Sequence, residues 1–246
     1  LIFARGVANI AITGSGTING QGAHQNFQHG NDSKGGPRRP KIIYFIGCNN
    51  VRVQDVTLRN SAYWTQDYEK CNGVIVRGVK VYSHANWNND GLDIDSRNVV
   101  VSDCYIDCDD DALCLKSDTD TPCENVTVTN CVLKSNCNAI KFGTSSYSGF
   151  KNVTISNCTI DRASEDHIRQ WYKNYPWIGT KHKTVVAGIA LESVDGGIIE
   201  NVSISDIAMQ GVQTPIFVRL GDRKRTFSKQ MSRINDVMIS RIVARS

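Results

Sequence analysis

The sequence has few of the features that mark nucleic-acid-binding, membrane or disulfide-rich proteins. Its 246 residues include 28 basic and 24 acidic ones, and no basic run is longer than a few residues, which argues against charge-driven nucleic-acid binding. No apolar run is long enough to span a membrane, and residues 1–6 lack the pattern of a signal peptide. Proline is scarce at five residues, whereas glycine and β-branched residues are common, which favours strands. The nine cysteines contain no Cys-x-x-Cys pair, and the chain is too long for a small disulfide scaffold.

A repeat with a period in the twenties runs through most of the chain. Its unit reads Asn-Val-x-Val/Ile-x-x-apolar-x-apolar, anchored at Val51, Val74, Val99, Val126, Val153, Val202 and Val237. The interval of 49 residues between Val153 and Val202 is expected to hold two turns, with a degenerate turn around residues 187–190. Such periods, with short alternating runs, are typical of a stacked solenoid.

Apolar residues recur two, five and seven residues after each anchor, and three before it. These offsets share no helix face, but in a coil of short strands they all point inward. The predicted fold class is therefore all-β, a single-stranded right-handed parallel β-helix with little helix. We expect one such domain over residues 1–246, truncated at one or both ends, because solenoids usually need caps and no capping helix is visible.

The same columns explain six cysteines and the repeated asparagine. Core columns hold Cys48, Cys71, Cys104, Cys123, Cys131 and Cys158, which we expect to be small buried apolar side chains, with a metal or redox site as the lesser alternative. The asparagines that precede the anchors are expected to stack at a bend and to hydrogen-bond to one another.

A second alignment marks one face of the coil. Residues 90–96, 111–117, 138–144 and 187–193 superpose, with Leu92, Leu113, Ile140 and Ile189 directed inward. The alternate positions are expected to face solvent: Asp93, Asp95, Cys114, Lys116, Lys141, Ala190 and Glu192. Because neighbouring parallel strands lie about 4.8 Å apart, Asp90 and Asp111 should be one turn from each other.

These positions form an acidic cluster that we define as Asp90, Asp93, Asp95, Asp109, Asp110 and Asp111. Stacked carboxylates repel one another, which separates their pKa values. One carboxyl that keeps its proton can then act as an acid while the others activate water, as in glycoside hydrolysis. Two alternatives stay open: aspartates at strand ends also form bends and caps, and a cluster of oxygen ligands suits Ca²⁺.

At these residues the chain resembles glycoside hydrolase family 28, the polygalacturonase family, over essentially its whole length. The resemblance rests on residues 9–22 (Asn-Ile-Ala-Ile-Thr-Gly-Ser-Gly-Thr-Ile-Asn-Gly-Gln-Gly), 88–93 (Asn-Asn-Asp-Gly-Leu-Asp) and 110–117 (Asp-Asp-Ala-Leu-Cys-Leu-Lys-Ser). It implies a pectin-lyase-like solenoid and an inverting hydrolase that needs no cofactor and no metal. Carried over by motif, Asp110 would be the general acid, and Asp90 and Asp111 would hold and deprotonate the attacking water. Asp93 would line the cleft.

Two of the family's motifs are missing. The position of its Gly-His-Gly histidine is taken by Asn138, and its Arg-x-Lys, which grips the galacturonate carboxylate, is matched by residues 190–192, Ala-Leu-Glu. Glu192 would repel an anion, so the resemblance implies a divergent branch with another pectic or neutral sugar at the cleavage site. The substrate-binding candidates are Asp93, Asn138 and Glu192, together with the cations Lys116, Lys141 and Arg219.

The repeat is interrupted between Asp161 and Val186 by an aromatic and basic stretch, which either stacks on sugar rings or folds over the solenoid.

The first functional hypothesis is a polygalacturonase-like hydrolase that cleaves a plant cell-wall pectic polysaccharide with inversion. The alternatives are a Ca²⁺-dependent pectate-type lyase and a non-catalytic carbohydrate-binding β-helix. The expected partner is a polysaccharide or oligosaccharide, and we expect a monomer with no nucleic-acid or membrane partner. The resemblance also implies a secreted or periplasmic protein.

Overall fold

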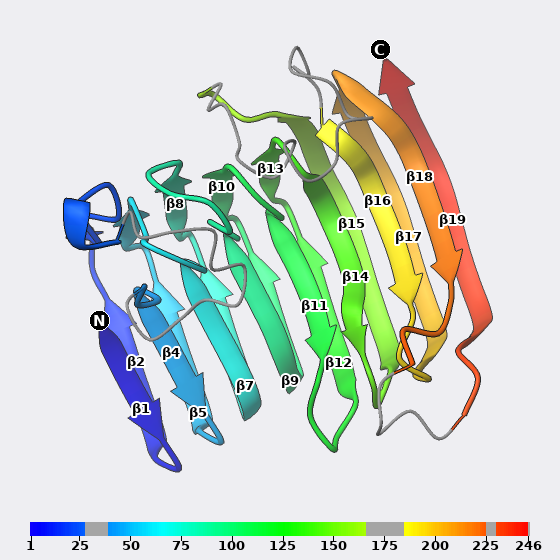
Figure 1. The fold of residues 1–246 in the computed structure, drawn as a ribbon, viewed down its shortest axis with the longest axis horizontal. Helices are drawn as coiled ribbons and strands as arrows, with labels where there is room; N and C mark the ends of the chain where they lie inside the picture. The colour runs from blue at the N-terminus through cyan, green and yellow to red at the C-terminus, as the bar shows by residue number, and fades with distance from the viewer. Residues whose placement is uncertain (28–38, 166–184, 225–229, 246) are drawn as a thin grey trace.

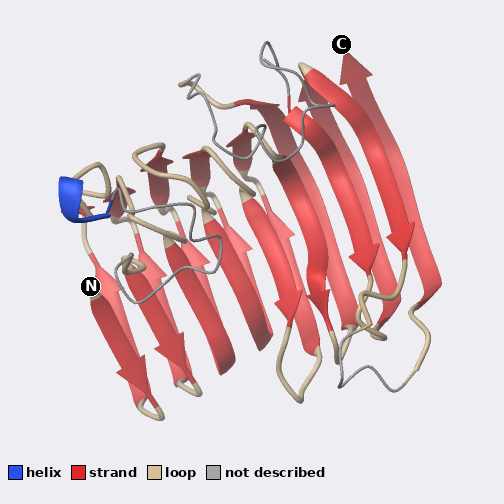
Figure 2. Ribbon diagram, in the orientation of Figure 1, coloured by secondary structure: helices blue, strands red, loops and turns tan. Residues whose placement is uncertain are grey.

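The strands of the chain wind into a continuous coil around one apolar core. The computed structural model describes residues 1–27, 39–165, 185–224 and 230–245, and runs from the N-terminal strands at one end to the C-terminal strands at the other (Figure 1). Strands dominate these residues (Figure 2), in which the one helical element is the single 3₁₀ turn η1 (Gln25–Phe27). No helix in the described ranges combines the length and apolarity needed to cross a membrane.

The strands all belong to one parallel sheet that closes on itself as a coil. Their bounds are β1 (Ile2–Arg5), β2 (Ala8–Thr13), β3 (Thr17–Asn19), β4 (Ile43–Ile46), β5 (Asn49–Gln54), β6 (Thr57–Arg59), β7 (Gln66–Arg77), β8 (Lys80–Ser83), β9 (Leu92–Ser102), β10 (Tyr105–Cys108), β11 (Leu113–Ser117), β12 (Cys123–Thr129), β13 (Val132–Ser135), β14 (Asn138–Ser146), β15 (Phe150–Arg162), β16 (Val185–Ser193), β17 (Ile198–Gln210), β18 (Val212–Leu220) and β19 (Arg233–Arg245).

The pairing register confirms the predicted columns. Val126 pairs with Val99 on one side and with Val153 on the other, and Val202 pairs with Val237. With the right-handed crossovers that parallel strands adopt, the molecule is the predicted right-handed parallel β-helix.

One prediction about the winding is wrong. Val153 pairs directly with Val202, so the interval of 49 from one to the other makes one turn and not two. The residues around 187–190 belong to β16, which is the second side of that turn and pairs with β14. The additional residues of the long interval lie between the end of β15 and the start of β16, and the strands on both sides keep the ordinary register.

The predicted asparagine stack is confirmed at the bends that precede Val74, Val99, Val126, Val153 and Val202. The side-chain amide of Asn98 donates to Asn72 Oδ1 at 2.7 Å, and the series continues upward through Asn125, Asn152 and Asn201 at 2.9–3.0 Å. Asn98 has φ +57°, a left-handed conformation that asparagine tolerates better than most residues. The repeat therefore combines a bend and a hydrogen-bonded ladder in one residue type.

The interior is apolar, as the columns predict. All six column cysteines are buried in the core cluster as free thiols, where other turns place valine, isoleucine or phenylalanine. They pack as small apolar side chains.

Candidate active site

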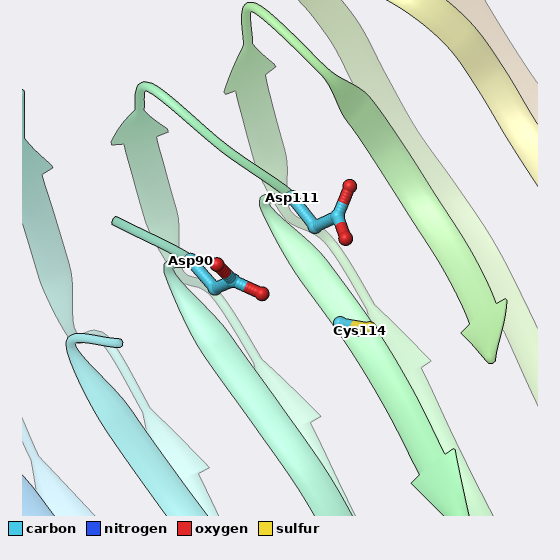
Figure 3. A group of neighbouring side chains, drawn as sticks. All are labelled: Asp90, Asp111 and Cys114. Carbon is cyan, nitrogen blue, oxygen red and sulfur yellow. The ribbon is translucent and has the colours of Figure 1, made fainter. Parts of the chain in front are cut away.

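The two aspartates on which the functional hypothesis depends lie on neighbouring turns. Asp90 directly precedes the turn into β9 and Asp111 the turn into β11, and the two strands pair through Leu92 and Leu113. Both side chains project from the outer face of the coil, together with Cys114 (Figure 3). One carboxylate oxygen of each aspartate and the Cys114 sulfur all lie within 4.8 Å of one another.

The Asn-Asp-Gly sequence holds Asp90 in place. The buried Asn89 amide donates to Ser61 O at 2.7 Å, while its Oδ1 accepts from Asn86 N at 2.7 Å. Gly91 passes so close to the next turn that a Cβ there would lie 2.3 Å from Ile106 Cγ2 and 2.7 Å from the backbone oxygen of Ala112. Asparagine and glycine therefore form a rigid support beneath the aspartate.

Asp111 is built to carry a negative charge. Its Oδ1 accepts from Asn138 Nδ2 at 2.7 Å, and its Oδ2 accepts from Lys141 Nζ at 2.8 Å. Burial alone would raise the pKa of Asp111, but Lys141, Lys116 and Asn138 outweigh burial and bring that pKa below its usual value.

Asp90 is in the opposite situation. Burial first, and then the charges of Asp93 and Asp110, raise the pKa of Asp90 well above its usual value, although Lys116 acts against them. Its Oδ2 lies 3.6 Å from Lys116 Nζ, and its Oδ1 is buried without a hydrogen-bond partner in the described residues. Asp90 therefore favours its protonated form, whereas Asp111 favours its charged form.

Asp110 joins this pair from the side. A carboxylate oxygen of Asp110 lies within 4.8 Å of one from Asp111 and of the Cys137 sulfur. Its Oδ1 accepts from the backbone N–H of Asp111 at 2.9 Å, and its backbone oxygen accepts from Ser135 Oγ at 2.6 Å. Asp110 is half-buried, so the three aspartates converge at a place that reaches the surface.

The prediction that the alternate positions face solvent is wrong for most of them. Asp93, Cys114 and Ala190 are 0% exposed, and Asp95 and Glu192 are also buried. The long side chains beside them provide the cover, because Lys116 Nζ lies 3.1 Å from Asp93 Oδ1 and 4.2 Å from the centre of the Trp64 ring. Lys116 and Lys141 are themselves mostly covered and hold the acids in ion pairs.

The remaining substrate-binding candidates lie farther along the same face. Glu192 on β16 pairs in register with Arg219 on β18, whose side chain is exposed. Burial raises the pKa of Glu192, with Lys141 and Arg219 acting against it. The neighbouring Arg223 is bound to Asp195 and to Thr144, which gives it a structural role.

Two aspartates of the acidic cluster make local contacts instead of joining the convergent three. Asp95 accepts from Asp118 N at 2.9 Å and from Thr119 Oγ1 at 3.3 Å, and so caps the turn after β11. Asp109 Oδ1 accepts from Asn136 Nδ2 at 3.0 Å. For these two the alternative interpretation, bends and caps, describes the hydrogen bonds.

Asp67 and Lys41 lie beside the predicted site residues but are not among them. Asp67 pairs in register with Asp93 and forms an ion pair with Lys41, whose ammonium also lies 4.5 Å from the Trp64 ring centre. Extending the second alignment one turn toward the N-terminus, so that residues 67–69 match residues 93–95, would have found it. The predicted aromatic and basic stretch lies mostly outside the described residues.

Replacement of Asp95 by asparagine is expected to stabilise the protein above neutral pH. Burial raises the pKa of Asp95 from 3.8 to about 7, against its two hydrogen bonds. The folded state therefore binds its proton more tightly than the unfolded state, so wild-type stability falls as pH rises from about 4 to 7. Asparagine removes this cost, on the order of 4 kcal/mol above pH 8 and little at pH 4.

The amide fits the site, because its nitrogen can donate to Thr119 Oγ1 while that hydroxyl donates to Thr121 O. Urea unfolding of both proteins at pH 4 and pH 8 measures the difference. If the free energy of unfolding of the variant exceeded that of the wild type equally at both pH values, or did not exceed it at pH 8, the prediction would be wrong.

Comparisons with known proteins agree with the predicted fold and with the family resemblance. The family model of glycosyl hydrolases family 28 matches residues 1–246. A probable polygalacturonase of Arabidopsis thaliana is 33% identical over 115 residues, covering 46% of this chain and 24% of that protein. One from Vitis vinifera is 33% identical over 125 residues, covering 49% and 25%. The matched segments thus span about a quarter of these relatives.

Two solved structures share the fold. The family 28 exopolygalacturonase of Yersinia enterocolitica superposes with a TM-score of 0.74 at 19% identity, covering 97% of this chain and 48% of that one. The polygalacturonase of Erwinia carotovora ssp. carotovora gives 0.74 at 16% identity, covering 100% and 69%. Because the family model matches over the full range of the sequence, the chain belongs to glycosyl hydrolases family 28.

Proposed function

We propose that this chain is a polygalacturonase-like glycoside hydrolase that cleaves a pectic polysaccharide or oligosaccharide. Family membership and the polygalacturonases among its relatives support the reaction class and the substrate class. The observation that carries the proposal is the convergence of Asp90, Asp110 and Asp111 on adjacent turns. The substrate class in turn implies a secreted or periplasmic protein, which we expect to act as a monomer.

The split between Asp90 and Asp111 supports distinct roles. Asp111, whose charge Lys141 and Asn138 maintain, is the base that takes a proton from the attacking water. Asp90, which favours its proton, can donate it in a hydrogen bond to that water and so orient it. Asp110, half-buried at the edge, is the general acid that protonates the leaving oxygen.

The stereochemistry is the part of the proposal that spacing does not support. Nearest oxygens of Asp110 and Asp111 lie within 4.8 Å, whereas the acid and base of most inverting enzymes are about 6.5–9.5 Å apart. Inversion is therefore proposed from the family resemblance, and the anomer of the first product decides it.

The surrounding residues are proposed to divide into support and substrate contact. Asp93 is fully covered, so it acts through Lys116 and does not touch the sugar. Lys141 and Asn138 hold Asp111. Arg219, exposed on β18 next to Glu192, is the cation placed to meet an acidic sugar, while Glu192 borders that position.

Incubation with defined pectic oligosaccharides, neutral and acidic, tests the proposal. We expect new reducing ends with saturated sugars, and proton NMR early in the reaction to show the inverted anomer. The retained anomer would overturn inversion but not hydrolysis. Products with an unsaturated, ultraviolet-absorbing end, formed only with Ca²⁺, would establish the lyase alternative. Binding of oligosaccharides without any cleavage would establish the non-catalytic one.

A further inference from the structure

A thiol lies among the carboxylates of the site, outside the apolar core. Cys114 is fully buried, yet it is on the outer face of β11 and is not part of the core cluster, unlike the six column cysteines. Its sulfur donates to Gly143 O at 3.2 Å and accepts from Lys116 Nζ at 3.4 Å. Figure 3 shows it beside Asp90 and Asp111. Nothing in the proposed hydrolysis uses this sulfur.

We propose that Asp90, Asp111 and Cys114 form a binding site for a thiophilic divalent cation of the Zn²⁺ or Cd²⁺ class, which blocks the place of the attacking water. One donor atom of each residue lies within 4.8 Å of the other two, so small side-chain movements bring all three to coordinating distance. Binding itself does not depend on the proposed function, whereas the inhibition does.

A second observation points to a ligand at this place. Asp90 is 3% exposed, and its Oδ1 is buried with no hydrogen-bond partner in the described part of the chain. A buried oxygen without a hydrogen-bond partner loses its contacts with water and gains none in return, and a bound cation would compensate for this loss. The other two donors, the Asp111 carboxylate and the Cys114 sulfur, lie on the same side of the strands (Figure 3).

The local charges also leave room for a divalent cation. Cation binding must displace both the proton that Asp90 favours and the thiol proton of Cys114. With both protons released to solvent and Asp93 ionised, Asp90, Asp93, Asp111 and Cys114 carry four negative charges, and the ion-paired Lys116 and Lys141 carry two positive ones. A divalent ion neutralises the difference. Binding of the ion requires the Lys116 ammonium to move away from the Cys114 sulfur. The flexible four-carbon side chain of lysine permits this movement, and the free energy that it costs limits the affinity.

The donor set selects the class of metal. Ca²⁺ takes six to eight oxygen ligands, and Mg²⁺ takes oxygen ligands in an octahedron, so a site with two carboxylates and a sulfur suits neither. A set of thiolate and carboxylate ligands suits Zn²⁺ and Cd²⁺. Three protein ligands leave further coordination positions for water. Excess Ca²⁺ should therefore not displace the bound metal.

Titration of the whole chain with Cd²⁺ tests the site, because a cadmium–thiolate bond gives an ultraviolet charge-transfer band. We expect one equivalent to bind, with the band lost and the affinity reduced at least about 100-fold in Cys114→Ala. Cys137→Ala is the matched control, because Cys137 lies beside Asp110 and Asp111 and could form a competing site. It should keep the band. Circular dichroism before and after titration checks that the metal leaves the fold intact.

If the charge-transfer band survived in Cys114→Ala and disappeared in Cys137→Ala, the metal would be bound at Cys137 and the proposal would be overturned. The absence of stoichiometric Cd²⁺ binding to the wild type would overturn it as well. Asp90→Asn, which keeps the thiol but removes an anionic ligand, should weaken binding and leave the band visible at saturation. Binding with these properties but without inhibition of any glycan cleavage would uphold the metal site and count against the proposed catalytic roles.

Discussion

Replacing Asp110 by asparagine is expected to lower kcat about 10²–10⁴-fold while the fold stays intact. Asparagine has the shape of aspartate, and its side-chain oxygen can still accept from the backbone N–H of Asp111, which the native Oδ1 does at 2.9 Å. It has no acidic proton, so the leaving oxygen must depart without protonation. The rate of appearance of reducing ends from a pectic oligosaccharide, at saturating substrate, measures the loss.

The matched control for this variant is Asp236→Asn. Asp236 is exposed at the bend position that other turns fill with asparagine, and it has the same left-handed backbone, at φ +53°. The same chemical change there should leave kcat within about twofold, because surface substitutions away from the site rarely matter. If Asp110→Asn kept more than a tenth of the wild-type kcat, Asp110 would not be the general acid.

Replacing Gly91 by alanine is expected to destabilise the protein by about 1–3 kcal/mol and to lower activity as well. The added methyl group would meet Ile106 Cγ2 and, at 2.7 Å, the backbone oxygen of Ala112, which cannot turn away as a flexible side chain could. The strands would have to separate, and Gly91 N currently donates to Asp111 O at 2.8 Å. The change would therefore move Asp90 and Asp111 relative to each other.

Gly16→Ala provides the comparison, because a Cβ at Gly16 has no atom within 4 Å. Denaturant unfolding should show a loss for the Gly91 variant and none for the Gly16 variant. Equal stabilities of the two variants would mean that the close approach at Gly91 does not constrain the site.

The winding of the chain could be predicted because each turn repeats the same inward positions. Val51 pairs with Val74, and Val99 pairs with Val126, as their shared column in the sequence predicts. The cysteine and asparagine columns follow from the same register. The 49-residue interval misled the prediction, because a period in the sequence counts residues and cannot distinguish a second turn from a longer corner.

The convergence of Asp90 and Asp111 could be predicted for the same reason, but their surroundings could not. The alternation of side chains along a strand assigns Asp93 and Glu192 to the outer face of the coil, where side chains are usually exposed to solvent. The burial of these two residues depends on how the side chains of Lys116, Lys141 and Trp64 lie across the strands. Side-chain packing of this kind cannot be predicted from the repeat. The opposite pKa shifts of Asp90 and Asp111 arise from that packing.

The direct pairing of Val153 with Val202 has a practical meaning for engineering. Because β15 and β16 keep the ordinary register with their neighbours although more residues connect them than connect the strands of other turns, we expect exchange of the connecting residues to leave the coil unchanged. Segments from other members of the family, transplanted between β15 and β16, would then leave Asp90 and Asp111 on their neighbouring turns.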